Sequence, residues 1–312
     1  MIAAFARSTA IRLAVTVVIL IYLARQVDLR ESARALFGIN PTHLIAVLAL
    51  VAVDRVVMIA RWVLLLGAVD TPISLRAAAR IFLVSSFVGS FLPAGIGGDA
   101  ARAYSLARQT ARGSDAVASV AIDRLLGLTS IAMMGALGAA IWSPSGAGSA
   151  RNALFWSAMA VIVATFALFW SDRLIRTVIP HAWLESGLGA RFERLVLAIT
   201  RYRSQPRAVM LVLLLSVGVQ LLRILQAYLL GRGVSIAVPF SYYLVFMPVG
   251  LLMLLLPVSV SGFGLPQGVI VWMLRPLGVP DPQSLALSTL IVLTGLAGNL
   301  PGALLYLRPK NK

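Results

Sequence analysis

Six apolar stretches, each long enough to cross a lipid bilayer, constrain this chain more than any other feature. A membrane-spanning helix needs about 20 predominantly apolar residues. None of the stretches alternates with the period of two that a strand of a membrane β-barrel would have. We therefore predict an all-α integral membrane protein with six full spans. The stretches lie at 9–27, 43–67, 115–142, 152–170, 207–230 and 283–307.

The composition favours the same class, because 60% of the 312 residues are apolar and only 12% are charged. Soluble domains are about 45–50% apolar and about 25% charged. A net charge of +16 would suggest nucleic acid as the partner of a soluble protein, but here the basic residues lie among runs too apolar for a soluble surface. We expect no nucleic-acid partner. The chain has no cysteine, which excludes disulfides, thiolate metal sites and thiol catalysis.

Two further apolar stretches are interrupted by proline and glycine. The first breaks at Leu92–Asp99 and the second at Pro257–Pro266. Proline removes a backbone donor and glycine weakens a helix, so both stretches should unwind there. Unwound backbone persists at membrane depth only inside protein or beside a water-filled cavity. We therefore expect two broken re-entrant helical hairpins, at 75–112 and 240–277, in addition to the six spans.

The order span, span, broken hairpin, span occurs twice, at 9–142 and at 152–307, with opposite orientation. Inverted repeats with interrupted helices in matching positions are typical of transporters that bind substrate near the membrane midplane. The alternative is two ordinary spans kinked by proline and glycine. We interpret 1–312 as a single transmembrane domain. The segment 171–207 has the pattern of an amphipathic interfacial helix and is expected to be a cytoplasmic linker between the halves.

The arginines also predict an orientation. If the N-terminus is cytoplasmic and both hairpins leave on the side they entered, most of the 27 basic residues fall on the cytoplasmic side. This distribution follows the positive-inside rule. We therefore expect both termini to be cytoplasmic, and much of the positive charge then serves to orient the chain.

Charged side chains within the apolar stretches are candidates for function, because each costs about 2.5–3.5 kcal/mol at the bilayer centre on insertion scales. Arg61, near the end of a span, can extend its side chain to the interface. One hypothesis is structural ion pairing between spans. The other is a polar cavity in which arginines bind an anionic headgroup and carboxylates hold the arginines in place, Asp54 by charge pairing. The charged residues are Asp54, Arg55, Arg61, Asp123, Arg124 and Arg223.

The first break adds a possible anion site. Asp99 and the glycines before it open a helix whose first turns carry Arg102. The N–H groups and the positive dipole end of that helix favour an anion, and Arg102 offers a bidentate fork to phosphate. Asp99 is explained equally well as the N-cap of the helix.

Patterns for catalysis are missing from the sequence. His43 and His181 lack metal-ligand spacing, and no motif of a serine hydrolase, zinc protease or P-loop NTPase occurs. We expect no catalytic residue, no metal and no cofactor, and therefore not an enzyme.

Three segments together resemble the lysylphosphatidylglycerol synthase transmembrane family, also called the flippase-like domain family. They are Arg61–Leu66, Phe91–Tyr104 and Ala121–Leu128. The resemblance implies a membrane protein that moves a lipid between leaflets. It also implies functional roles for several matching positions, and less directly for Arg61. These positions are Gly97, Gly98, Asp99, Arg102, Asp123 and Arg124.

The chain departs from the family in two places. The family's second break usually reads Gly-Gly-x-Gly followed by Arg-Glu, whereas Pro266 and Gln267 replace the charged pair here. The chain also ends at residue 312 without the soluble aminoacyl-transferase domain, so we do not expect it to make lysylphosphatidylglycerol itself. We retain the polar and glycine positions of the second break as candidate headgroup contacts. They are Ser261, Gly262, Gly264 and Gln267.

These observations favour a transporter or flippase that moves a lipid with a polar or phosphate-bearing headgroup between the leaflets of the bacterial inner membrane, and we expect that lipid to be anionic. Two alternatives stay open, namely a membrane enzyme that modifies lipid headgroups and a non-transporting partner of a lipid-synthesis enzyme. The expected substrate-binding residues come from the spans and from both breaks. They are Arg55, Arg61, Gly97, Gly98, Asp99, Arg102, Asp123, Arg124, Arg223, Ser261, Gly262, Gly264 and Gln267.

Overall fold

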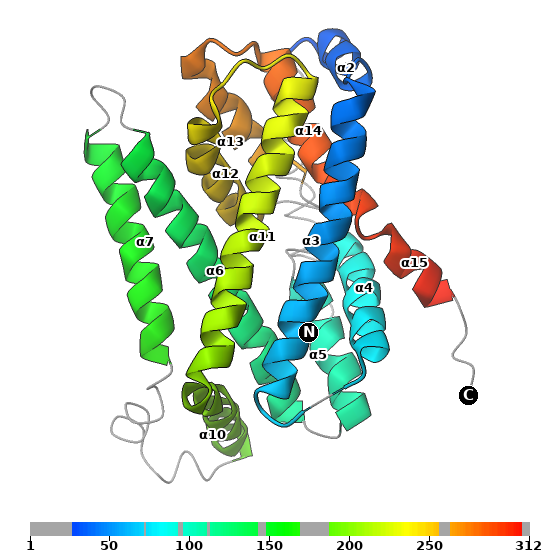
Figure 1. Cartoon of the computed structure of the whole chain (residues 1–312), viewed down its shortest axis with the longest axis vertical. Helices are drawn as coiled ribbons and strands as arrows, with labels where there is room; N and C mark the ends of the chain where they lie inside the picture. Colours follow the sequence, from blue (N-terminus) through cyan, green and yellow to red (C-terminus); the bar gives the residue numbers. More distant parts are fainter. Residues whose placement is uncertain are drawn as a thin grey trace.

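The computed structural model is a bundle of helices (Figure 1). No β-strand occurs in the residues it describes. The all-α class is therefore confirmed. The described residues are 27–71, 73–92, 96–110, 113–142, 148–168, 187–255 and 263–307.

Four helical segments are long and apolar enough to cross a membrane, and each matches a predicted span. They are α3 (Pro41–Gly67), α6 (Gly113–Ile141), α11 (Pro206–Gly233) and the segment Asp281–Leu307. Large apolar side chains on these helices face outward, among them Val56 and Leu214. An outward apolar surface is what a bilayer requires, and the chain is a multi-pass membrane protein.

The other two predicted spans have different outcomes. The stretch 152–170 corresponds to helix α7 (Gly148–Leu168), whose apolar part, Phe155–Ala167, is shorter than a full span. The stretch 9–27 lies outside the described residues except for Val27. Six full spans are therefore not established among the described residues.

Helices α3 and α11 form the centre of the bundle, packed side by side and antiparallel (Figure 1). Asn40 caps the start of α3 by accepting a hydrogen bond from the Thr42 N–H, and Pro41 occupies the first turn. Pro206 likewise occupies the first turn of α11. At this position the missing N–H of proline costs nothing, because it would have no partner within the helix. Buried apolar side chains from these and neighbouring helices form one core, including Val47, Val51, Ile224, Leu230, Tyr243, Phe246 and Leu287.

Two pairs of shorter helices occupy the positions of the predicted hairpins. Helix α4 (Leu75–Phe91) packs against α5 (Ile96–Thr110), and α12 (Phe240–Leu255) packs against α13 (Leu265–Leu274). Figure 1 places the first pair in the lower half of the bundle and the second in the upper half. Of the predicted breaks at 92–99 and 257–266, residues 93–95 and 257–262 lie outside the described residues. The expectation of unwound backbone was wrong for 96–99 and 265–266, because these residues already belong to the first turns of α5 and α13.

The first pair depends on two glycines that face each other. A Cβ on Gly98 would lie 2.9 Å from the Ser85 carbonyl oxygen and 3.2 Å from the Gly89 Cα. A Cβ on Gly89 would lie 2.8 Å from the Gly98 Cα. The 2.9 Å and 2.8 Å distances are too short for a Cβ, so only glycine at these two positions lets α4 and α5 approach this closely.

Two features were not predicted from the sequence or differ from the prediction. A short helix, α2 (Leu29–Phe37), precedes α3 and is capped by Asp28. The last predicted span bends at Gly298 and Asn299, which separate α14 (Asp281–Ala297) from α15 (Leu300–Leu307). Pro301 follows directly and cannot donate a hydrogen bond to continue the earlier helix.

The predicted linker 171–207 is described from residue 187 onward. Its described part forms α10 (Gly187–Thr200) and a 3-10 turn, η2 (Arg201–Ser204), and α10 packs against α6. Another 3-10 turn, η3 (Arg275–Leu277), connects α13 to α14. Figure 1 places α10 at the lower end of the bundle, beside the start of α6.

Candidate binding cavity

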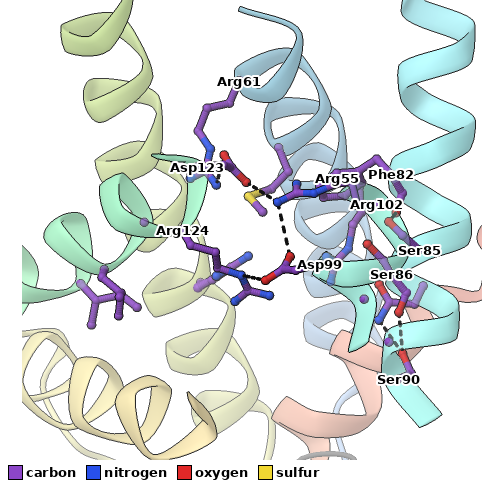
Figure 2. A pocket seen from close by; sticks show the side chains of 18 of the residues that line it. Arg55, Arg61, Phe82, Ser85, Ser86, Ser90, Asp99, Arg102, Asp123 and Arg124 are labelled. Atoms are coloured by element: carbon purple, nitrogen blue, oxygen red, sulfur yellow. Dashed lines mark hydrogen bonds and ion pairs between the residues drawn. The ribbon is translucent and has the colours of Figure 1, made fainter. Parts of the chain in front are cut away.

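A polar cavity of about 300 Å³ lies within the bundle, walled by α3, α4, α5, α6 and α11 and by Asn299. The charged residues singled out in the sequence converge on it from four helices (Figure 2). Asp54 alone among them is not part of the lining, although it binds two arginines that are. The charged lining residues are Arg55, Arg61, Asp99, Arg102, Asp123, Arg124 and Arg223.

Asp123 of α6 binds two arginines of the cavity from two other helices. Its Oδ1 lies 2.8 Å from Nη2 of Arg61, and its Oδ2 accepts a 3.0 Å hydrogen bond from Nη2 of Arg102. Arg61 also donates a 2.9 Å hydrogen bond to the Ser216 hydroxyl. The Arg61 side chain is only 4% exposed, so the expectation that it extends to the interface was wrong, because a buried carboxylate and a hydroxyl bind it instead.

Arg102 of α5 is fixed from three sides. Besides Asp123, it contacts Asp99 at 3.4 Å, three residues earlier on the same helix. Its guanidinium carbon lies 5.2 Å from the ring centre of Trp62 and 5.6 Å from that of Phe82. Aromatic rings attract a cation placed over their faces. The Arg102 guanidinium is therefore held in one position on the cavity wall.

Asp99 bridges two arginines at the more open side of the cavity. Its Oδ1 faces Arg102 and its Oδ2 accepts a hydrogen bond from Nε of Arg124 (Figure 2). Asp99 lies in the first turn of α5, which begins at Ile96, so it is not the N-cap. A carboxylate in the first turn of a helix is stabilised by the helix dipole.

Asp54 joins α3 to α11. Its Oδ1 accepts a 3.0 Å hydrogen bond from Nε of Arg223, and its Oδ2 lies 3.8 Å from Nη1 of Arg55. Arg55 also donates a 3.4 Å hydrogen bond to the Gly295 carbonyl on α14. Ion pairing between spans and a polar cavity were alternative hypotheses, and the structure combines them, because the paired arginines also line the cavity.

The cavity includes polar residues that the sequence analysis did not select. Ser85, Ser86 and Ser90 line it from α4, with Gln220 of α11 and Asn299. The buried Oε1 of Gln220 and Oδ1 of Asn299 accept no hydrogen bond within the described part of the chain. Burying a side-chain amide without a hydrogen-bond partner is costly. An amide within a predicted span is therefore a sequence signal for a polar site, and this signal could have identified Gln220 and Asn299.

The charges around the cavity do not balance. Five arginines line it, and three aspartates, including Asp54, bind them. Two positive charges are therefore in excess, in a setting where charges interact more strongly than in water. Such a site favours an anion with acceptor oxygens, and guanidinium groups bind carboxylate and phosphate oxygens in a bidentate manner.

The remaining candidate residues have different positions. Gly98 lines the cavity at the α4–α5 contact, and a Cβ on Gly97 would meet the Leu92 side chain. Gln267 is buried and accepts a 2.6 Å hydrogen bond from the Gly264 N–H, which caps the start of α13. Neither Gln267 nor Gly264 lines the cavity.

Ser261 and Gly262 lie outside the described residues. No three His, Asp or Glu residues of the described segments are close enough together to hold a metal ion.

The three segments that carried the family resemblance meet at this cavity. They contribute Arg61 from α3, Asp99 and Arg102 from α5, and Asp123 and Arg124 from α6. Residues 9–302 match the family described as Lysylphosphatidylglycerol synthase TM region, a range that includes the whole cavity lining. The chain belongs to the lysylphosphatidylglycerol synthase TM region family.

Membership in the lysylphosphatidylglycerol synthase TM region family makes the chain a membrane protein of lipid metabolism or transport. No curated protein matched the chain. The cavity is lined by guanidinium and carboxylate groups, which suit a charged group better than an apolar chain.

Proposed function

We propose that this protein moves a lipid with an anionic, phosphate-bearing headgroup between the leaflets of the bacterial inner membrane. The observation that carries the proposal is the convergence of five arginines from α3, α5, α6 and α11 on one cavity, with two positive charges in excess of the aspartates. Phosphate supplies several acceptor oxygens and a charge of the opposite sign.

The size of the cavity fits a headgroup rather than a whole lipid. Its volume of about 300 Å³ is at the lower end of the roughly 300–1,000 Å³ of small-molecule sites, which is too small for two acyl chains. In the proposed mechanism the phosphate exchanges water for guanidinium groups while the acyl chains stay in the bilayer. No ATP-binding motif occurs in the sequence, so movement would follow a lipid or ion gradient.

The two helix pairs support an alternating mechanism. The α4–α5 pair and the α12–α13 pair occupy opposite halves of the bundle (Figure 1), as two re-entrant hairpins of an inverted repeat would. In such repeats, movement of one half against the other exposes a midplane site to each side in turn. Cytoplasmic termini and re-entrant hairpins are part of this proposal.

The proposal also holds that the protein is not an enzyme. The aspartates of the cavity are bound by arginines, namely Asp54 by Arg223 and Asp123 by Arg61 and Arg102. A carboxylate held by guanidinium groups is a poor proton acceptor. Asp99 is likewise bound by Arg102 and Arg124. In this proposal none of the three aspartates serves as the general base that headgroup hydrolysis or transfer requires.

A vesicle assay tests the function. Purified protein is reconstituted with fluorescent phosphatidic acid or fluorescent phosphatidylcholine, and the fraction of label reachable from outside is followed over time. We expect transfer of the phosphatidic acid to exceed that in empty vesicles, and to fall at least about tenfold in Arg102→Ala, because a desolvated guanidinium contact is lost.

The matched control is Arg275→Ala. Arg275 forms an exposed pair with Asp281 away from the cavity, so its loss should leave transfer unchanged. Equal transfer in protein-containing and empty vesicles would overturn the function. Equal transfer of both lipids by the protein would overturn the requirement for an anionic headgroup.

A further inference from the structure

Asp99 differs from the other two aspartates of the arginine network in its exposure. The side chains of Asp54 and Asp123 are each 3% exposed, whereas that of Asp99 is 22% exposed. Its partner Arg124 has the most exposed side chain of the five cavity arginines, at 44%. The Asp99–Arg124 pair is therefore the part of the network that an arriving ligand reaches first.

Asp99 also binds the two arginines best placed to hold an anion. Its Oδ1 accepts a hydrogen bond from Nη2 of Arg102, and its Oδ2 accepts one from Nε of Arg124. Arg102 cannot turn away, because Asp123, Trp62 and Phe82 fix it. The carboxylate of Asp99 thus occupies the position between Arg102 and Arg124 that the anionic group of a ligand would need.

We propose that Asp99 is a displaceable internal counter-ion, whose carboxylate occupies the phosphate position of the empty cavity and leaves it when a ligand's phosphate binds Arg102 and Arg124. This inference rests on the proposed function, since it names the residue that selects among headgroups at the same site. It requires only that the Asp99 side chain turn away from the two arginines, with no covalent step.

The exposure of each pair explains why Asp99 is the aspartate that leaves. A partly exposed ion pair is screened by water and contributes little to stability. Separating Asp123 from Arg61 and Arg102 would instead leave uncompensated charges in a buried place. A phosphate group brings more acceptor oxygens and more negative charge than the carboxylate that it replaces.

The exchange gives the cavity a selection rule. A headgroup enters only if its anion binds the two arginines better than the Asp99 carboxylate does. A phosphate monoester meets this condition, whereas a headgroup whose phosphate is already neutralised by its own ammonium group competes poorly. Removing the carboxylate should therefore raise the affinity for phosphate and weaken the discrimination between the two kinds of headgroup.

The test measures binding of dihexanoyl phosphatidic acid to purified protein in detergent by calorimetry. The variants are Asp99→Asn and Asp99→Ser, both of which remove the charge and keep a small polar side chain. The matched control is Asp281→Asn, because the Asp281 side chain is also 22% exposed and is paired with an arginine, Arg275. We expect phosphatidic acid to bind about fivefold more tightly to both Asp99 variants, the gain from removing one partly exposed competitor, and equally to the control.

Unchanged or weaker binding by the Asp99 variants, where the wild type binds phosphatidic acid, overturns the displacement and leaves the proposed function intact. Loss of the fold in both variants overturns it too, because the carboxylate would then be structural. Absence of binding by the wild type overturns the proposed function itself. Inorganic phosphate is titrated in parallel. If it binds and responds to Asp99→Asn while phosphatidic acid does not bind, the displacement stands and the lipid is overturned as its source.

Discussion

Arg61 and Asp123 form a 2.8 Å ion pair that joins α3 to α6, with neither side chain more than 4% exposed. The pair lies inside the predicted spans, where water cannot compensate for the loss of either partner. Its effect on the fold therefore depends strongly on whether one partner or both partners are removed.

The first prediction concerns this pair. Asp123→Leu should lower the free energy of unfolding by about 3–5 kcal/mol, because Arg61 and Arg102 lose a buried partner. The double variant Arg61→Met with Asp123→Leu should lower it less, since it removes one of the two stranded cations. Titration of each variant with a denaturing detergent, with the unfolded fraction followed at each step, measures both free energies of unfolding. A double variant less stable than Asp123→Leu would contradict the prediction.

The second prediction concerns the contact between α4 and α5. Gly98→Ala places a carbon atom 2.9 Å from the Ser85 carbonyl oxygen, so the two helices must separate. We expect a loss of about 1–3 kcal/mol, typical of overpacking, together with slower lipid transfer. Gly218→Ala is the control, because nothing lies within 4 Å of a Cβ there, and it should keep wild-type stability. Equal stability of the two variants would show that the close approach is unimportant.

The sequence predicts the helices more accurately than their contacts. The stretch 43–67 became α3 (Pro41–Gly67) and 207–230 became α11 (Pro206–Gly233), because apolar length alone defines a span. The same criterion could not detect the bend at Gly298 and Asn299, since apolar residues continue on both sides. Helix α2 was missed although Asp28 and Glu31 form a recognisable helix start.

The candidate site was predicted as a set of residues but not as a set of pairs. The cost of a charge in a bilayer drew attention to Asp54, Arg61 and Asp123, and all three belong to the cavity network. Spacing along one chain does not indicate that Arg61 binds Asp123 while Asp54 binds Arg223. The pairing depends on how α3, α6 and α11 pack against one another. No residue pattern within a single sequence indicates that packing directly.

The third prediction concerns Tyr202, which lies between α10 and α11. Its side chain is fully buried, and its hydroxyl has no hydrogen-bond partner within the described residues. Tyr202→Phe should therefore raise the free energy of unfolding by about 1 kcal/mol, since an unmet buried polar group is removed. A thermal melt at pH 7 measures this, and a lower melting temperature would indicate a hydroxyl partner.

The same variant tests the alkaline response. Burial, with smaller contributions from Asp115 and Asp123, raises the pKa of Tyr202. The unfolded chain loses this proton near pH 10, so the folded protein, which keeps the proton, loses stability as the pH rises above that value. The melting temperature of the wild type should fall more steeply than that of Tyr202→Phe above about pH 10. Parallel curves would contradict the assignment.

The fourth prediction uses the absence of cysteine to map topology without background labelling. The substitutions are Gln109→Cys near the end of α5, Ser204→Cys in η2 directly after α10, and Leu277→Cys in η3 directly after α13, all at exposed positions. Figure 1 shows α5 and α10 in the lower part of the bundle and α13 in the upper part. A membrane-impermeant maleimide should label Leu277→Cys in intact cells and the other two only in inverted vesicles. Labelling of all three from one side would contradict the proposed orientation and the opposed hairpins.

The wall of the cavity is completed late along the chain. Asn299 donates a 2.9 Å hydrogen bond to the Ser90 hydroxyl near the end of α4, and Arg80 donates a 3.4 Å bond to the Leu305 carbonyl of α15. The first helix pair therefore acquires its last neighbour only after more than two hundred further residues have been synthesised. Until then the ribosome-bound chain contains all five cavity arginines but lacks one wall of the cavity, so the site is complete only after synthesis has passed α15.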